Sequence, residues 1–145
     1  MSNELTNKQL ALEELKLLLD IAQGQEELRF KIRGWCIALV TAFSVAFLSE
    51  KIKFSGCQFI LISSLILVLF LWLDVLYRVA QDRAFKRSKV VEENLRGIGN
   101  YSGPLIGEYL SVPNSAKDQV VSLKNIRVYG PYVLLLVIVV SIGIM

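Results

Sequence analysis

Residues 54–73 read FSGCQFILISSLILVLFLWL, twenty residues without a charge between Lys53 and Asp74. An α-helix needs about 20 apolar residues to cross the hydrocarbon core of a bilayer. Two further uncharged stretches, residues 34–49 and 128–145, have 16 and 18 residues, and helix can continue from the shorter one through its charged flanks. Three buried core helices are the alternative, but they would leave too little amphipathic chain to cover a core. The sequence therefore predicts an all-α membrane protein with three transmembrane helices, a hairpin followed by a C-terminal span.

The composition also points away from a soluble enzyme. Apolar residues make up 54% of the 145 residues and charged residues 20%, whereas a soluble domain has about 25% charged residues. The chain has no histidine, which is the commonest general base and metal ligand. It also has no glycine-rich phosphate loop and no Cys/His metal spacing. We therefore expect no enzyme activity, no catalytic residue, no metal and no cofactor.

The basic residues are distributed unevenly along the chain. Residues 1–33 carry five, residues 50–53 carry two and residues 74–127 carry nine of the 16 lysines and arginines. The positive-inside rule then places the N-terminus and residues 74–127 in the cytosol, with the link 50–53 and the C-terminus outside. Tryptophans and tyrosines favour the membrane interface, and Trp35, Trp72, Tyr129 and Tyr132 all fall at the same predicted interface. The predicted location is the bacterial inner membrane.

The segments divide accordingly. Residues 1–33 form a cytosolic amphipathic helix, 34–73 the transmembrane hairpin, 74–127 a cytosolic region of helix and loop, and 128–145 the last span. Leu12, Leu15, Leu19 and Ala22 follow a spacing of three and four, typical of a coiled-coil seam. This helix either oligomerises or packs on its own chain or on the lipid headgroups.

The second span continues into the cytosol as one helix over residues 57–96, because no glycine or proline interrupts it. Ala84, Ser88 and Val91 belong to a stripe that can pack on the N-terminal helix. Gly97 is a natural residue just past the helix end. Residues 97–113 are rich in glycine and proline and predict a loop, after which Asn114 or Ser115 caps a short helix.

Small residues recur along the first span at every fourth position. Gly34, Ala38, Ala42 and Ala46 have this spacing, and Thr41 adds a hydroxyl beside them. Such rows allow close approach of helix backbones in a membrane. The row predicts contact with another helix, either in a second subunit or around a pore, or in the second span of the same chain.

Asp74 lies at the cytosolic edge of the second span. An ionisable residue at this depth is a functional candidate unless it is paired. Arg78 is one helical turn away, and Arg33 at the start of the first span is an alternative partner. We expect an ion pair at the membrane interface.

Beyond Asp74 runs a basic group, Arg83, Lys86, Arg87 and Lys89. It either reflects the positive-inside rule and attraction to anionic lipid, or forms a site for an anionic ligand. The ligand class that fits is the phosphate groups of a nucleotide or oligonucleotide, bound by several subunits around an axis.

Two segments frame the hairpin, ELRFKIRGWC at residues 27–36 and FLWLDVLYRVAQDRAFKRSKVVEENL at residues 70–95. Here the chain resembles the SLATT-like two-transmembrane effectors of bacterial antiphage and conflict systems, over about residues 10–96. The resemblance implies an effector that oligomerises in the inner membrane, permeabilises it and arrests growth. It also implies control by the nucleotide product of a partner nucleotidyltransferase or by another sensor. The third apolar segment departs from the family pattern, so either the first or the third span lines the pore.

The sequence therefore predicts a homo-oligomeric membrane effector or ion channel gated by an anionic cytosolic ligand. The alternative is a non-conducting membrane scaffold or adaptor that recruits a soluble partner.

Overall fold

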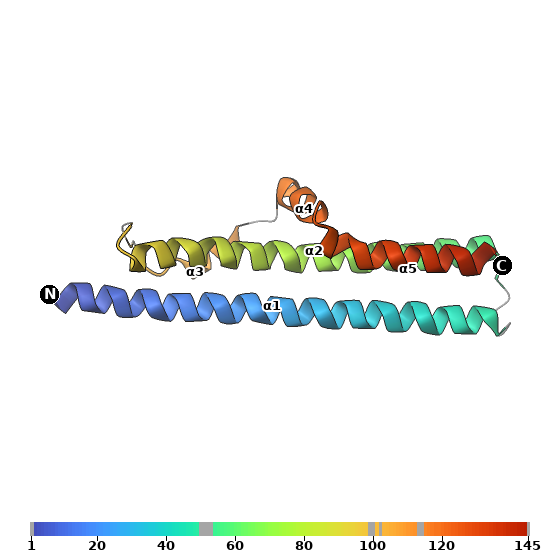
Figure 1. The fold of residues 1–145 in the computed structure, drawn as a ribbon, viewed down its shortest axis with the longest axis horizontal. Coiled ribbons are helices and arrows are strands. Elements are labelled where there is room, and N and C mark those ends of the chain that lie inside the picture. Colours follow the sequence, from blue (N-terminus) through green and yellow to red (C-terminus); the bar gives the residue numbers. More distant parts are fainter. Residues whose placement is uncertain (1, 50–53, 99–100, 102, 113–114, 145) are drawn as a thin grey trace.

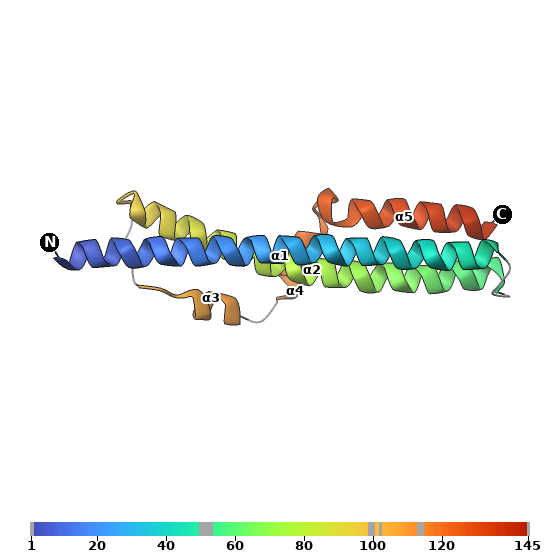
Figure 2. The ribbon, with the colours of Figure 1, turned by 90° about the horizontal axis from the view of Figure 1, so that it is seen from below.

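The computed structural model describes residues 2–49, 54–98, 101, 103–112 and 115–144. Their regular structure is helical throughout: α1 (Ser2–Leu48), α2 (Gly56–Leu95), α3 (Ile106–Ser111), α4 (Ala116–Leu123) and α5 (Ile126–Ile144). Helices α1 and α2 lie antiparallel along their lengths, and α5 lies beside α2 (Figures 1 and 2). Helices α1, α2 and α5 are each long and apolar enough to cross a membrane, which confirms the predicted all-α membrane protein.

The two long helices extend well past a bilayer. The 47 residues of α1 correspond to about 70 Å and the 40 residues of α2 to about 60 Å, at 1.5 Å per residue. The hydrocarbon core is only about 30 Å thick. We call residues 34–73 and 128–144 the membrane half, and the described part of residues 2–33 and 74–127 the polar half.

Helix ends follow the local sequence. Ser55 begins α2 with a capping box, in which its hydroxyl accepts a hydrogen bond from the Gln58 N–H at 3.3 Å and its own N–H donates to Gln58 Oε1 at 3.1 Å. This box starts α2 one residue before the predicted Cys57. Gly97 has a φ of +80° just past the end of α2, as predicted. Ser115 caps α4, also as predicted, whereas Asn114 lies outside the described residues.

The membrane half packs around side chains from three helices. Cys36 and Val40 of α1, Phe59 and Leu67 of α2, and Tyr132 and Val139 of α5 form this core. Phe59 stacks between Phe43 and Phe47, with ring centroids 5.3 and 4.3 Å apart. At the hairpin end, α2 and α5 approach so closely that a Cβ on Gly56 would collide with the carbonyl oxygen of Gly143. The C-terminal end of α5 therefore lies beside the start of α2.

The N-terminal part of α1 packs on its own chain. Ala11, Leu18 and Ala22 form a second core with Ala84 and Val91 of α2, which confirms the predicted stripe on α2. The predicted leucine seam is confirmed at Leu15 and Ala22, which pack in this core, but it is wrong at Leu12 and Leu19, which are 48% and 46% exposed. The helix is rotated so that Ala11, Leu18 and a carboxylate, Glu14, face inward.

Candidate functional site

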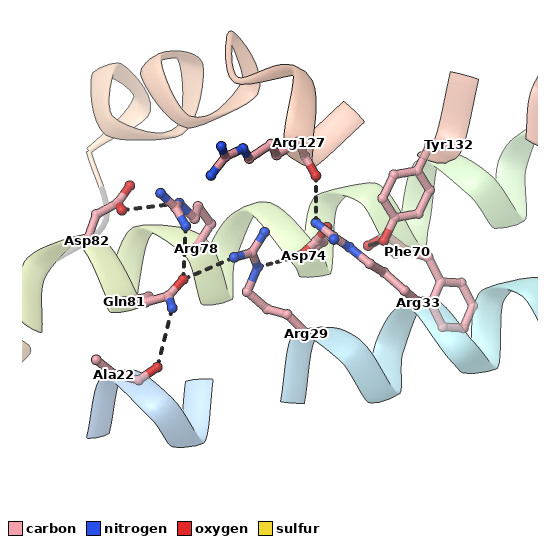
Figure 3. Close-up of polar contacts among 10 residues, drawn as sticks. All are labelled: Ala22, Arg29, Arg33, Phe70, Asp74, Arg78, Gln81, Asp82, Arg127 and Tyr132. Carbon is pink, nitrogen blue, oxygen red and sulfur yellow. Dashed lines mark hydrogen bonds and ion pairs between the residues drawn. The ribbon is translucent and has the colours of Figure 1, made fainter. Parts of the chain in front are cut away.

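Asp74 sits at the boundary between the two halves and binds two arginines of α1 (Figure 3). Arg29 Nε lies 2.6 Å from Asp74 Oδ1. Arg33 donates to Asp74 Oδ2 from Nε at 2.9 Å and from Nη2 at 2.7 Å. The Asp74 side chain is 0% exposed, so these bonds supply the compensation that a buried carboxylate requires.

Gln81 extends this network along α2. Its Oε1 accepts hydrogen bonds from Arg29 Nη1 at 3.0 Å and Arg78 Nη1 at 3.1 Å, and its Nε2 donates to the Ala22 carbonyl at 3.4 Å. Arg78 forms its ion pair with Asp82, at 3.1 Å. The predicted ion pair of Asp74 with Arg78 is therefore wrong. Asp74 binds the alternative partner Arg33, together with Arg29, which was not predicted.

The same network reaches the third helix. Arg33 Nη2 donates to the Arg127 carbonyl at 3.0 Å. One turn into α5, the Tyr132 hydroxyl donates to the Phe70 carbonyl at 3.3 Å. Arg33, Asp74 and Arg127 thus mark one level across α1, α2 and α5 (Figure 3), and aromatic residues flank it on each helix, as at a membrane interface.

A second buried ion pair lies in the polar half. Arg87 binds Glu14 through two bonds, Nε to Oε1 at 2.8 Å and Nη2 to Oε2 at 3.2 Å. Glu14 also accepts from the Tyr101 hydroxyl at 2.8 Å and from the Leu105 N–H at 3.2 Å. Arg87 Nη2 donates to the Gly103 carbonyl at 3.0 Å. We call this cluster of Glu14, Arg87, Tyr101, Gly103 and Leu105 the clasp. It holds the segment before α3 against α1 and α2.

Contacts within the clasp shift the pKa values of Glu14, Arg87 and Tyr101. Burial alone would raise the pKa of Glu14, but the hydrogen bonds from Arg87, Tyr101 and Leu105 outweigh it and the pKa is lowered. Hydrogen bonding to Glu14 raises the pKa of Arg87. Burial and the bond to Glu14 raise the pKa of Tyr101 to about 12. Both members of the ion pair are therefore charged at neutral pH.

The four basic residues predicted to form one ligand site, Arg83, Lys86, Arg87 and Lys89, do not lie together in the structure. Arg87 is buried and held by Glu14, so it does not face solvent with the others. Arg83 Nη2 lies 3.5 Å from Asp118 of α4, and its Nη1 donates to the Val112 carbonyl. Arg83 and Lys86 line a cleft of about 130 Å³ between α2 and α4, together with Asp82 and Asp118. Lys89 is exposed and does not line it.

The row of small residues on the first span faces away from the rest of the chain. Gly34, Ala38, Thr41 and Ala42 are exposed, and Ala46 is partly buried. A Cβ on Gly34 would meet no atom within 4 Å. The row therefore does not pack on α2, whose contacts with α1 use Cys36, Val40 and Phe43 instead.

Sequence reasoning missed Glu14, Arg29 and Gln81. Glu14 could be found only once the inner face of α1 is known, because it lies one turn before the buried Leu18 on that face. Comparison with known proteins finds no matching family model, no matching curated protein and no matching solved structure.

Proposed function

We propose that the protein is a homo-oligomeric effector of a bacterial antiphage defence system, which conducts ions across the inner membrane under the control of an anionic cytosolic ligand. The uneven distribution of basic residues supports a cytosolic polar half. The observation that carries the proposal is the outward face of α1 in the membrane half.

That face offers what a helix contact in lipid requires. Lipid tails are as apolar as leucine, so helices associate in membranes through close packing of small residues. Gly34, Ala38, Thr41 and Ala42 leave a shallow face opposite the α2 contact, with a threonine hydroxyl upon it. In the proposed oligomer this face contacts the neighbouring subunit or lines the pore.

The ligand is proposed to act on the link between α2 and α4. Arg83 holds Asp118, and Lys86 lies in the same cleft. Asp118 is 43% exposed, and exposed ion pairs contribute only about 0–1 kcal/mol. The phosphates of a nucleotide or oligonucleotide can therefore replace Asp118 at Arg83. Since α4 continues within three residues into α5, its release would move the third span.

Ion flux from liposomes that contain the pure protein tests conduction. We expect potassium efflux from vesicles in which chemical cross-linking confirms an oligomer. Ala38→Leu should reduce both efflux and oligomer formation, whereas Leu69→Phe, on an exposed face of α2 away from the contacts with the other helices, is the control. An oligomer that passes no ions with or without nucleotide rejects the proposal.

The proposed ligand link has its own test. Asp118→Asn should raise efflux without ligand, because Arg83 then loses its carboxylate partner. Glu108→Gln, an exposed acidic position on α3, is the control. Equal efflux from the two variants would reject control through α4.

A membrane adaptor is the second candidate, and one observation favours it. Leu10, Leu12, Leu17 and Leu19 are exposed on the polar half of α1, where a soluble partner can reach them. Capture of such a partner by a non-conducting oligomer, lost in Leu12→Gln and Leu19→Gln, would support this function over the channel.

A further inference from the structure

An apolar groove runs between α2 and α5 in the membrane half. It has a volume of about 180 Å³ and is lined by Leu67, Val68 and Leu71 of α2 and by Tyr129, Val133 and Leu136 of α5. Val68 and Val133 are both more than 45% exposed, so the groove is open along its side. Because it lies within the membrane-spanning part of both helices, lipid is the surrounding medium.

The polar end of this groove carries an excess of positive charge. The network of Figure 3 contains four guanidinium groups, those of Arg29, Arg33, Arg78 and Arg127, and the carboxylates of Asp74 and Asp82. Glu26, which lines a small cavity with Arg29 and Arg33, adds a third carboxylate, so one positive charge remains in excess. Arg127 lies at the N-terminal end of α5, two residues before Tyr129, which lines the groove. Its guanidinium forms no ion pair or hydrogen bond with the residues that the structure describes, although its carbonyl accepts from Arg33.

From these two features we propose that the groove and Arg127 form a binding site for an anionic phospholipid. One acyl chain lies along the groove, and the headgroup phosphate binds the Arg127 guanidinium. The positive excess of the network adds attraction, since basic pockets between transmembrane helices suit anionic headgroups. A zwitterionic lipid fills the groove equally well but gains less from the charge, so the site selects by headgroup. This inference does not depend on ion conduction.

Native mass spectrometry of the full chain tests the site. The protein is extracted from bilayers that contain equal amounts of phosphatidylglycerol and phosphatidylcholine with matched acyl chains. We expect phosphatidylglycerol to be retained preferentially. Arg127→Gln should lower the ratio of retained phosphatidylglycerol to phosphatidylcholine about fivefold, as for one basic charge at the membrane surface. Arg96→Gln, at the far end of α2, removes the same charge away from the groove and should keep the ratio.

A second variant separates the groove from surface charge alone. Val133→Phe fills the groove without changing charge and should lower retention of both lipids. Leu134→Phe places the same ring on the neighbouring exposed position and should not lower retention. Equal retention of the two lipids by the wild type would overturn the proposal. If Val133→Phe retains both lipids as the wild type does, the lipid does not bind in the groove and the proposal is rejected. If this variant changes the size of the oligomer, the groove binds a second copy of the chain instead of a lipid.

Discussion

Asp74 is fully buried and binds two guanidinium groups, of which Arg29 is buried and Arg33 partly exposed, so removing its charge affects both arginines. In Asp74→Asn the amide keeps the shape but leaves Arg29 and Arg33 with uncompensated charge. Removing one partner of a buried ion pair costs about 3–5 kcal/mol. We expect a large fall in the thermal unfolding midpoint in detergent micelles.

The matched control is Asp82→Asn, which removes the exposed partner of Arg78 one turn away on the same helix. Exposed pairs contribute about 0–1 kcal/mol, so its midpoint should stay near that of the wild type. Equal shifts in the two variants would contradict a special role for Asp74.

The ionisation of Glu14 makes the stability of the polar half depend on pH. Its folded pKa is lowered from the ordinary value of 4.5, so the unfolded chain binds the proton more readily. The stabilisation is therefore present above pH 4.5 and is lost as the pH falls through the folded pKa. Hydrogen exchange of the amides in residues 11–22 should accelerate over that acidic range, after correction for the intrinsic exchange rate. Glu14→Gln should lack this acceleration, and a wild type without it would contradict the prediction.

At the residue scale, the sequence shows which charged residues need a partner better than it shows which residue each one binds. The alternative pair of Asp74 with Arg33 was predictable, because both lie at the same membrane interface. Glu14 and Arg87 are 73 positions apart, and their meeting depends on the rotation of α1 about its axis. That rotation places Ala11 and Leu18 inside instead of Leu12 and Leu19, which apolar spacing alone does not distinguish.

At the element scale, the contact of α2 with α5 depends on two glycines. A Cβ on Gly56 meets the backbone of Gly143, and a Cβ on Gly143 would lie 2.5 Å from Ile60 Cγ1. Gly56→Ala should therefore separate the helices and lower the unfolding midpoint. Gly34→Ala has open space around its Cβ and should leave the midpoint of the isolated chain unchanged or higher, because alanine favours helix. The same fall in both variants would contradict the close packing.

The lengths of the helices were largely predictable. An unbroken run without glycine or proline predicted α2, and α1 continues through Gly24 because packing on α2 offsets the modest helix penalty of one glycine. Helix α3 was not predicted, since its six residues lie in a glycine- and proline-rich segment. The clasp of Glu14 with Tyr101 and Leu105 orders the chain just before it, and no local pattern reveals that contact.

At the scale of the whole molecule, the fold places the start of α2 and the C-terminal end of α5 side by side. Cys36 is buried and Cys57 exposed, and both are free. A membrane-impermeant maleimide should label Cys57 from outside in intact cells. In a Cys57→Ser background, Lys124→Cys should be labelled only after the membrane is opened, because it lies at the opposite end of α5. Labelling of Lys124→Cys in intact cells would reverse the predicted orientation.

The two buried ion pairs also limit how α1 and α2 can move. One lies at the membrane boundary and the other 13 residues further along α2, at Arg87. A slip of one helical turn along the common axis would break the Glu14–Arg87 pair and leave both charges buried. At Asp74 it would leave one arginine where two now bind, because Arg29 and Arg33 are one helical turn apart. Sliding of α1 along α2 therefore costs free energy, and the two helices behave as one stiff unit that is fixed at two points. A signal that passes along α1 and α2, rather than through α4 and α5, therefore reaches the bilayer as a tilt or rotation of these two helices together.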